Sequence, residues 1–210
     1  MLHLLTLRWS LLTMKTLTRI VIFLCFSSSA LLAQLPTDTP VDALRHPAWN
    51  KGVWVAGSTS VASDPSAQSF SLGLRVGRVL TQERGKGFLR GTFEMAADII
   101  PINEWWINGG QYAAAINPLV LKWNFTKGCR IAPFVEADGG VVLSTANLPP
   151  GDTSNVNFTS GATVGVQMFR RKRNSINLGV KVFHLSNASL GNHNPGINSS
   201  LQFMLGYTWH

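Results

Sequence analysis

The chain contains 210 residues, with 18 lysine and arginine residues against 10 aspartate and glutamate residues and a formal charge of +8 at pH 7. A chain of this length is expected to form one domain. Its basic residues alternate with apolar residues along much of the sequence instead of lining one helix or loop, which argues against a nucleic-acid-binding protein.

The first 33 residues have the pattern of a cleaved secretory signal peptide, in which basic residues precede an apolar run and small residues follow it. The apolar run is far shorter than the ~20 residues that a membrane-spanning helix needs, and no later run comes closer. The basic residues are Arg8, Lys15 and Arg19, the apolar run covers 20–26 and the small residues cover 27–33.

The mature chain begins after this signal peptide. Cleavage after Ala30 and cleavage after Ala33 both fit the pattern, and Met14 is an alternative start of translation. Once the signal peptide is removed, Cys129 is the remaining cysteine, so no intramolecular disulfide is expected.

A short tail and one long patterned domain follow. The segment 34–50 is rich in proline, aspartate and threonine, has no hydrophobic period and is interpreted as an N-terminal periplasmic tail. From 51 to 210, segments of alternating apolar and polar residues are separated by turns, which indicates β-strands. The expected strands cover 53–61, 68–80, 88–101, 113–125, 131–145, 156–169, 175–187 and 196–209. The predicted fold is therefore all-β, an eight-stranded antiparallel transmembrane barrel of the outer membrane.

The alternation separates an apolar face from a charged face. One register is apolar, as in Leu72, Leu74 and Val76, and suits lipid. The other register carries charges that are expected to form a network of ion pairs, which fills the interior and leaves no pore. These residues are Arg75, Arg90, Glu94, Asp98, Lys122, Glu136, Asp138 and Lys181. A soluble barrel of lipocalin type would reverse the faces, but the signal peptide argues against it, as do strands longer than the ~9 to 11 residues of a tilted span.

The connections alternate between short basic turns and longer loops. The turns are expected over 81–87, 126–130 and 170–174, and the loops over 102–112, 146–155 and 188–195. Outer-membrane barrels keep short turns in the periplasm, so both ends of the domain are expected on that side. Trp105 and Trp106 are then expected in the outer aromatic belt, and the basic run 170–173 in a solvated turn near lipid phosphates.

The expected strand 175–187 carries the residues that point to chemistry. Its apolar register ends in His184 and Ser186, whose side chains point the same way with Cα atoms roughly 6 to 7 Å apart. A histidine so close can take the proton of a serine hydroxyl that attacks an ester and return it to the leaving alcohol. Asn187 and the loop 188–195 can donate hydrogen bonds to a developing oxyanion. Because the pair faces lipid, a membrane lipid is its expected substrate; polar residues at a membrane interface are the alternative interpretation.

The sequence around this pair resembles the signature of the lipid A 3-O-deacylase (PagL) family. The resemblance rests on Phe183-His184-Leu185-Ser186-Asn187-Ala188-Ser189, followed by Asn194-Pro195-Gly196-Ile197-Asn198. Members of the family are eight-stranded barrels that remove the ester-linked acyl chain at the 3-position of lipid A with a Ser-His-Glu triad. The resemblance implies a carboxylic ester hydrolase with Ser186 as nucleophile and His184 as general base. It also implies that Asn187 and Asn194 orient the substrate or stabilise the oxyanion.

The chain departs from the family pattern twelve residues after the serine, where it has Asn198 in place of the glutamate. An amide oxygen can orient the imidazole but cannot stabilise imidazolium with a full charge, so reduced or lost activity is expected. Simple alternation also directs Asn198 inward while His184 faces lipid. Either the last strand begins later, after an irregular stretch, or Asn198 is not the third member of the triad. Asp152 in the preceding outer loop is an alternative acid.

Three functions are compatible with these residues. The leading one is a lipid A 3-O-deacylase-like esterase that acts in the outer leaflet. The alternatives are a non-catalytic, degenerate barrel, which Asn198 favours, and an outer-membrane phospholipase or acyltransferase with similar chemistry. The expected partners are lipid A or lipopolysaccharide and the outer membrane, with a homodimer left open. No cofactor is expected, and no metal site, because the histidines outside the pair lack acidic neighbours at ligand spacing.

Overall fold

The computed structural model describes residues 40–61, 66–171 and 173–210, which form eight strands and two short 3₁₀ helices. The strands are β1 (Ala48–Ser60), β2 (Gln68–Val79), β3 (Gly91–Trp106), β4 (Gly110–Phe125), β5 (Ile131–Ser144), β6 (Val156–Arg171), β7 (Asn174–Ser186) and β8 (Ile197–Trp209). The 3₁₀ helices are η2 (Pro40–Leu44) and η3 (Gly87–Leu89). The predicted signal peptide lies outside the described residues.

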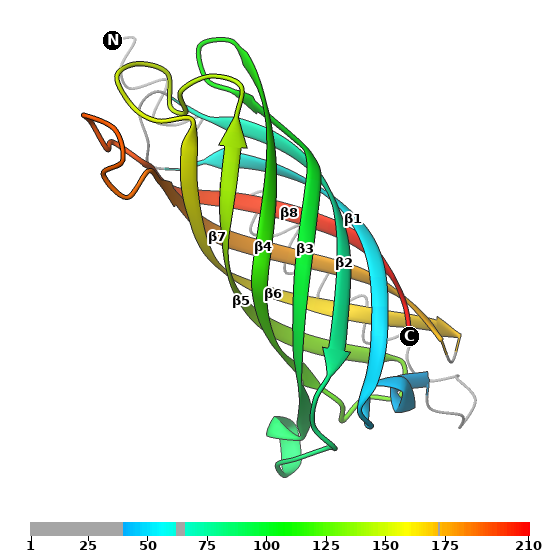
Figure 1. Cartoon of the computed structure of the whole chain (residues 1–210). Helices are drawn as coiled ribbons and strands as arrows, with labels where there is room; N and C mark the ends of the chain where they lie inside the picture. Colours follow the sequence, from blue (N-terminus) through cyan, green and yellow to red (C-terminus); the bar gives the residue numbers. More distant parts are fainter. Residues whose placement is uncertain (1–39, 62–65, 172) are drawn as a thin grey trace, which may run out of the picture. The chain divides into compact units, whose positions relative to one another are not determined.

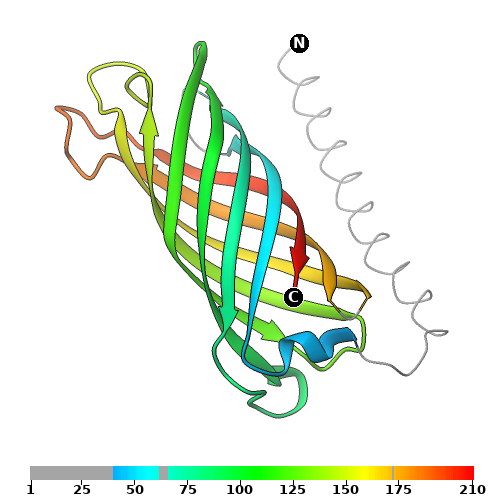
Figure 2. The same cartoon turned by 45° about the vertical axis from the view of Figure 1, so that its right-hand side comes forward.

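The strands form a closed barrel. Each strand pairs antiparallel with the next, and β8 pairs with β1 from Ser200 opposite Ser60 to Trp209 opposite Lys51 (Figure 1). Figure 2 shows the tilt of the strands around the barrel and η2 beside the end of β8. We call this end, with the connections β2–β3, β4–β5 and β6–β7, the turn end, and the opposite end the loop end. The predicted fold class is confirmed.

The two faces of the strands are as predicted over most of the barrel. Exposed apolar side chains such as Val76, Ile99 and Phe203 cover the outside, where a lipid bilayer would meet them. Among the described residues, no helix is long and apolar enough to cross a membrane.

The hairpin of β3 and β4 is longer than predicted. A loop was expected over 102–112, but β3 continues to Trp106 and β4 begins at Gly110, so this prediction is wrong. Positive φ angles of 52° at Asn108 and 131° at Gly109 allow the tight turn between them. The alternating residues before Asn108 therefore extend the strand instead of leaving it.

Trp105 lies inside the barrel, which corrects its predicted position in the outer aromatic belt. The pairing of β3 with β4 shifts between Ile100 and Asn103, and this irregularity changes which residues face inward. Ile100 is buried before the shift, and Asn103 and Trp105 are buried after it. Trp106 is 45% exposed, as expected for the belt.

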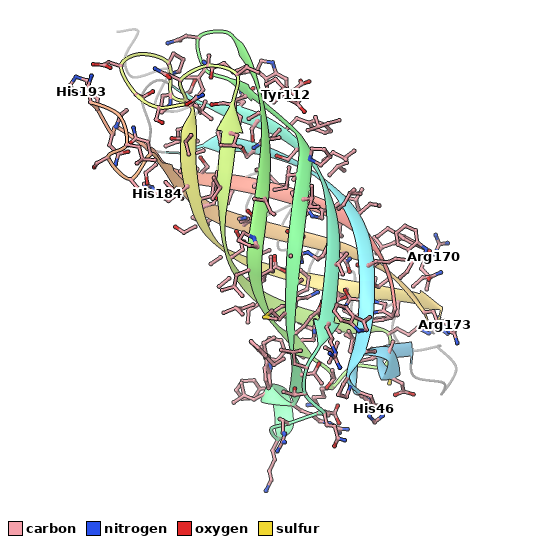
Figure 3. The ribbon with its side chains drawn as sticks, in the orientation of Figure 1. His46, Tyr112, Arg170, Arg173, His184 and His193 are labelled. Carbon is pink, nitrogen blue, oxygen red and sulfur yellow. The ribbon has the colours of Figure 1, made fainter. Side chains whose placement is uncertain are left out.

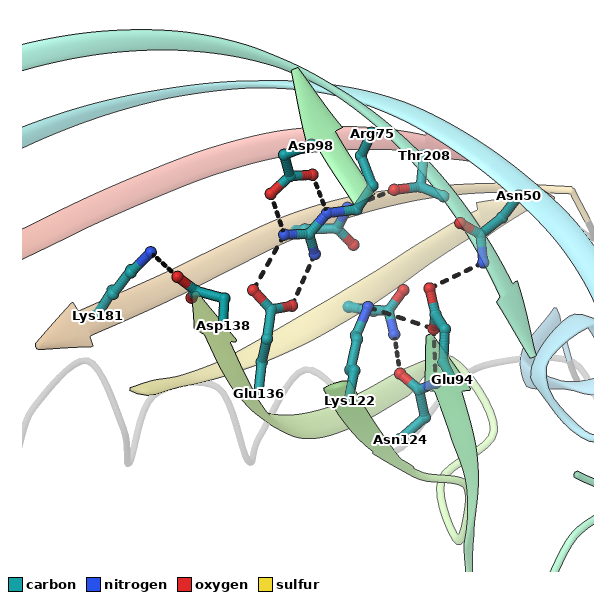
Figure 4. A network of polar contacts seen from close by, with 12 residues as sticks. Asn50, Arg75, Glu94, Asp98, Lys122, Asn124, Glu136, Asp138, Lys181 and Thr208 are labelled. Carbon is teal, nitrogen blue, oxygen red and sulfur yellow. Dashed lines mark hydrogen bonds and ion pairs between the residues drawn. The ribbon is translucent and has the colours of Figure 1, made fainter. Parts of the chain in front are cut away.

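The interior is filled by a network centred on Arg75 (Figure 4). Its guanidinium donates to both oxygens of Asp98 at 2.7 and 2.8 Å and to both oxygens of Glu136 at 2.6 and 3.0 Å. Lys181 Nζ lies 2.6 Å from an oxygen of Asp138. Bidentate pairing of this kind satisfies charges that lie out of water.

Glu94 forms the second part of the network, nearer the turn end. Its oxygens accept hydrogen bonds from Asn50 at 2.9 Å and Asn124 at 2.8 Å, and Lys122 Nζ lies 3.6 Å away. Gln167 in turn donates to Asn124 at 2.6 Å. These bonds connect four strands across the interior.

Arg90 does not belong to this network, which corrects its predicted inward position. Because η3 ends at Leu89, β3 begins at Gly91, and Arg90 lies outside the barrel, where it pairs with Glu83. Glu83 also accepts a hydrogen bond from Thr126 at 2.5 Å.

The helix η2 lies within the segment predicted to be a tail. Val41 and Leu44 are fully buried against Val79, Ala132 and Phe169 of the barrel. The residue after η2, Arg45, pairs with Asp42 at 2.8 Å and with Glu83 at 3.5 Å. The turn end of the described chain is therefore held by both apolar packing and charge.

Replacing Glu94 with alanine should destabilise the barrel more than replacing Asp138 with alanine. Loss of the Glu94 carboxylate leaves three partners without an acceptor, whereas loss of the Asp138 carboxylate leaves one. We expect a loss of about 1 to 3 kcal/mol for each buried partner left unsatisfied. Urea unfolding in detergent micelles measures this loss, with Glu104→Ala on the exposed face as the control. Unchanged unfolding midpoints for both interior variants would contradict the role of the network.

The Glu83 cluster should make stability depend on pH. Burial raises the pKa of the Glu83 carboxyl, but hydrogen bonds from Arg90 and Thr126 and the charges of Arg90 and Arg45 outweigh it, so the pKa is lowered. A lowered folded-state pKa stabilises the protein above the ordinary glutamate pKa, and the stabilisation is lost as pH falls through the folded value. Glu83→Gln should therefore lower the urea midpoint at pH 7 and have progressively less effect under acidic conditions. A difference that stays constant with pH would contradict this role.

Candidate active site

The loop end of β7 has a strict alternation of buried and outward residues. Phe183 and Leu185 are 6% and 0% exposed and belong to a hydrophobic cluster that closes the loop end of the barrel. Trp105 packs edge to face on Phe183, with ring centroids 6.1 Å apart. Because both neighbours of His184 are fixed inside, its imidazole is held on the outside of the barrel.

His184 is exposed, and Ser186, the last residue of β7, is half-buried on the same face. Figure 3 shows His184 near the loop end with His193, while Arg170, Arg173 and His46 lie toward the opposite end. No hydrogen bond joins His184 to Ser186 within the described part of the chain. In free enzymes such bonds are often long and shorten only when substrate is bound.

Asn187 fixes the loop that follows β7. Its side chain is 2% exposed, donates to the carbonyl of His193 at 2.8 Å and accepts from the backbone N–H of Ser189 at 2.9 Å. Its own backbone N–H donates to Oδ1 of Asn194 at 3.1 Å. Asn187 and Asn194 are thus brought together at the base of the loop, directly after Ser186.

Asp152 reaches the same loop from the β5–β6 connection. Its carboxylate accepts hydrogen bonds from Nδ2 of Asn192 at 3.0 and 3.1 Å, and its carbonyl accepts from the backbone N–H of His193 at 3.1 Å. No hydrogen bond joins Asp152 to His184 in the ranges that the structure describes. Asp152 therefore braces the loop.

The beginning of β8 contains a β-bulge beside His184. Leu185 pairs with Ile197 and Phe183 pairs with Ser200, so two positions of β8, 198 and 199, lie opposite the single position 184 of β7. Ile197 and Ser200 are both buried, which two residues of a regular strand at this spacing would not be. The strand thus begins irregularly at positions 198 and 199, so simple alternation does not apply there.

Sequence reasoning missed Ser160, an exposed serine of β6. It pairs directly with His184 across the β6–β7 ladder, while Phe158 pairs with Ser186. Counting residues along both strands from a tight turn after Arg171 places the partner of His184 within one residue of Ser160. The irregularity between Phe169 and Arg171 then moves the pairing to Ser160.

Comparisons with known proteins agree with this architecture. The sequence profile of the family described as Lipid A 3-O-deacylase (PagL) matches residues 70–208. The crystal structure of the outer membrane enzyme PagL is similar, with a TM-score of 0.55 and 24% identity over 75% of this chain and 99% of that chain. The crystal structure of Neisserial surface protein A (NspA) has a TM-score of 0.56 and 13% identity over 78% of this chain and 98% of that chain.

At these identities, the two structural matches show the fold, and the family assignment rests on the sequence profile. No curated protein sequence matches the chain significantly. The profile spans more than half of the chain, including all strands from β3 to β7 and the segment around His184 and Ser186. The chain is therefore an outer-membrane β-barrel that belongs to the lipid A 3-O-deacylase (PagL) family.

Proposed function

We propose that this protein is an esterase that hydrolyses the ester-linked 3-position acyl chain of lipid A in the outer leaflet. Membership of the PagL family implies a lipid A 3-O-deacylase-like function. The observation that carries the proposal for this chain is the outward pair His184 and Ser186 at the loop end of β7. A nucleophile and a base on the membrane-facing surface can reach a substrate that never leaves the bilayer.

The proposed reaction follows the chemistry of serine esterases. His184 takes the proton of the Ser186 hydroxyl as the serine oxygen attacks the ester carbonyl. The bond to the sugar oxygen then breaks, and the imidazolium returns the proton to that oxygen. Water, activated by the same histidine, next cleaves the acyl-serine ester and releases the fatty acid. Each proton that His184 accepts is thus given up again within the cycle.

Asn194 is the proposed donor to the oxyanion, and Asn187 is proposed to position it. The bond from the Asn187 backbone N–H to Oδ1 fixes the Asn194 amide through its acceptor, which leaves its N–H groups as donors. Asn187 starts the loop next to Ser186 and is held by its own bonds to His193 and Ser189. Preorganised amides are effective because they need no rearrangement as charge develops.

Asn198 is the proposed third member of the triad. The bulge at 198–199 brings this part of β8 opposite His184 in the ladder. An asparagine oxygen can orient the imidazole, but it stabilises the imidazolium less than a carboxylate does. We therefore propose a weaker esterase than a glutamate would give. The same substitution favours the second candidate, a barrel of this family that has lost catalysis.

Ser186→Ala and His184→Ala should each abolish release of 3-hydroxy fatty acid from lipid A, because one removes the attacking oxygen and the other the proton transfer. Loss of the base alone is expected to lower the rate roughly 10² to 10⁴-fold. Mass spectrometry of lipid A from cells that produce each variant gives the readout, and heat-dependent gel migration confirms that the barrel is folded.

Ser160→Ala separates the two outward-facing hydroxyls beside His184. It should leave the position of Ser186 unchanged, since Ser160 lies on a different strand. If Ser160→Ala abolishes deacylation and Ser186→Ala does not, the assignment of the nucleophile is wrong.

Asn198→Glu should raise the deacylation rate, because a carboxylate beside His184 stabilises the imidazolium that forms during attack. Asp152→Asn is the matched comparison, since it removes the only other acid proposed for this role and keeps an acceptor for Asn192. Initial rates on purified lipid A in detergent measure both variants. If the unmodified chain is inactive and Asn198→Glu confers no activity, the non-catalytic barrel is the correct interpretation.

A further inference from the structure

Two basic side chains lie on the membrane-facing surface near the turn end, in the outward register of β1 and β2. Lys51 and Arg78 are both exposed, and Lys51 pairs across the barrel seam with Trp209. Lys51 also pairs with Val76, so Arg78 lies diagonally opposite Lys51. The Cα atoms of Lys51 and Arg78 are then roughly 7 to 8 Å apart. The two cations can therefore contact the same ligand.

Aromatic rings flank this cation pair. Trp49 pairs with Arg78 and is 64% exposed, and the guanidinium carbon lies 5.3 Å from the centre of its ring. Trp209 on the other side of Lys51 is 41% exposed and packs edge to face on Tyr207. Tryptophan rings beside a cation at the end of a membrane span are typical of the level of lipid headgroups.

No salt bridge links Lys51 or Arg78 to a carboxylate among residues 40–61, 66–171 and 173–210. The acidic residues of the neighbouring strands, Glu94 and Asp98, face inward and are used by the interior network. A cation on a lipid-facing surface is destabilising unless an anion or water meets it. A phosphate group would supply that anion, and arginine can bind it through two hydrogen bonds.

An apolar cavity of about 350 Å³, open to the outside of the barrel, lies on the same outer face. Val53, Val55, Leu205 and Tyr207 line it on the outer face of β1 and β8. Val53 is two residues from Lys51 in the same register and pairs with Tyr207, as Lys51 pairs with Trp209. The cavity therefore lies on the side of the cation pair that faces the middle of the membrane.

We propose that Lys51, Arg78, Trp49 and Trp209 bind the phosphate of one anionic glycerophospholipid, with one of its acyl chains in the cavity over β1 and β8. Two cations with no carboxylate partner in the described part of the chain favour a headgroup of net negative charge over a zwitterionic one, whose own cation they would repel. A second copy of this chain is a poorer occupant, because a twofold interface centred here would bring two such cation pairs together. The site is separate from His184 and Ser186 and does not depend on the proposed function.

Native mass spectrometry of the full-length mature protein, delipidated in detergent, tests the site. Titration with dioleoylphosphatidylglycerol should give one tightly held lipid, and titration with dioleoylphosphatidylcholine should give weaker binding. Lys51→Gln combined with Arg78→Gln should weaken phosphatidylglycerol binding about tenfold or more, because charge-assisted hydrogen bonds to the phosphate are lost. Arg84→Gln with Lys86→Gln removes the same charge from the turn after β2 and should have no effect.

Val55→Trp tests the acyl chain separately. Filling the cavity should weaken binding of the dioleoyl lipid but leave binding of dihexanoylphosphatidylglycerol unchanged, because the short chains do not extend along it. Heat-dependent gel migration checks that every variant is folded. Equal binding of the two headgroups, unchanged binding by the Lys51 and Arg78 variant, saturation by inorganic phosphate alone, or a dimer mass in place of a lipid adduct would each overturn the proposal.

Discussion

The constraint on which the structure depends is that backbone N–H and C=O groups within a bilayer must pair with one another, because lipid offers them no partner. The eight strands satisfy this requirement because β8 pairs with β1 and closes the barrel. A barrel of this size has an interior just wide enough for side chains, and here Arg75, with its two carboxylates, and Glu94, with its amide partners, fill it. With its centre filled by these side chains, the barrel can offer chemistry only at its ends and on its outer surface.

The inward packing also determines the outward site. In a strand, a residue whose two neighbours are fixed inside has one direction left, and Phe183 and Leu185 are fixed in the cluster at the loop end. On the far side of Ser186, Asn187 is also fixed inside, by hydrogen bonds instead of apolar contacts. The rigidity that the proposed nucleophile and base need is therefore supplied by residues packed inside the barrel, and the membrane-facing side chains can remain exposed.

Most of the fold could be predicted from the sequence because a period of two residues is the direct consequence of strand geometry. The pattern predicted every strand, and seven of the eight charged residues that it directed inward lie inside the barrel. It failed where the period is interrupted. The irregularity between Ile100 and Asn103 turns Trp105 inward, and the short helix η3 leaves Arg90 outside the strand, paired with Glu83. Neither interruption has a signal in the alternation, since a bulge adds one residue without changing the composition around it.

The candidate site depends on the same kind of interruption. By simple alternation, Asn198 and His184 would belong to opposite faces, and only the resemblance to a known signature favoured joining them. The bulge between Ile197 and Ser200 interrupts that alternation at the cost of one regular pair in the ladder. A closed barrel can accept this cost near its rim, where the strand begins and water can satisfy a backbone group. The bulge opposite His184 therefore lies where a strand end can depart from the period without opening the barrel.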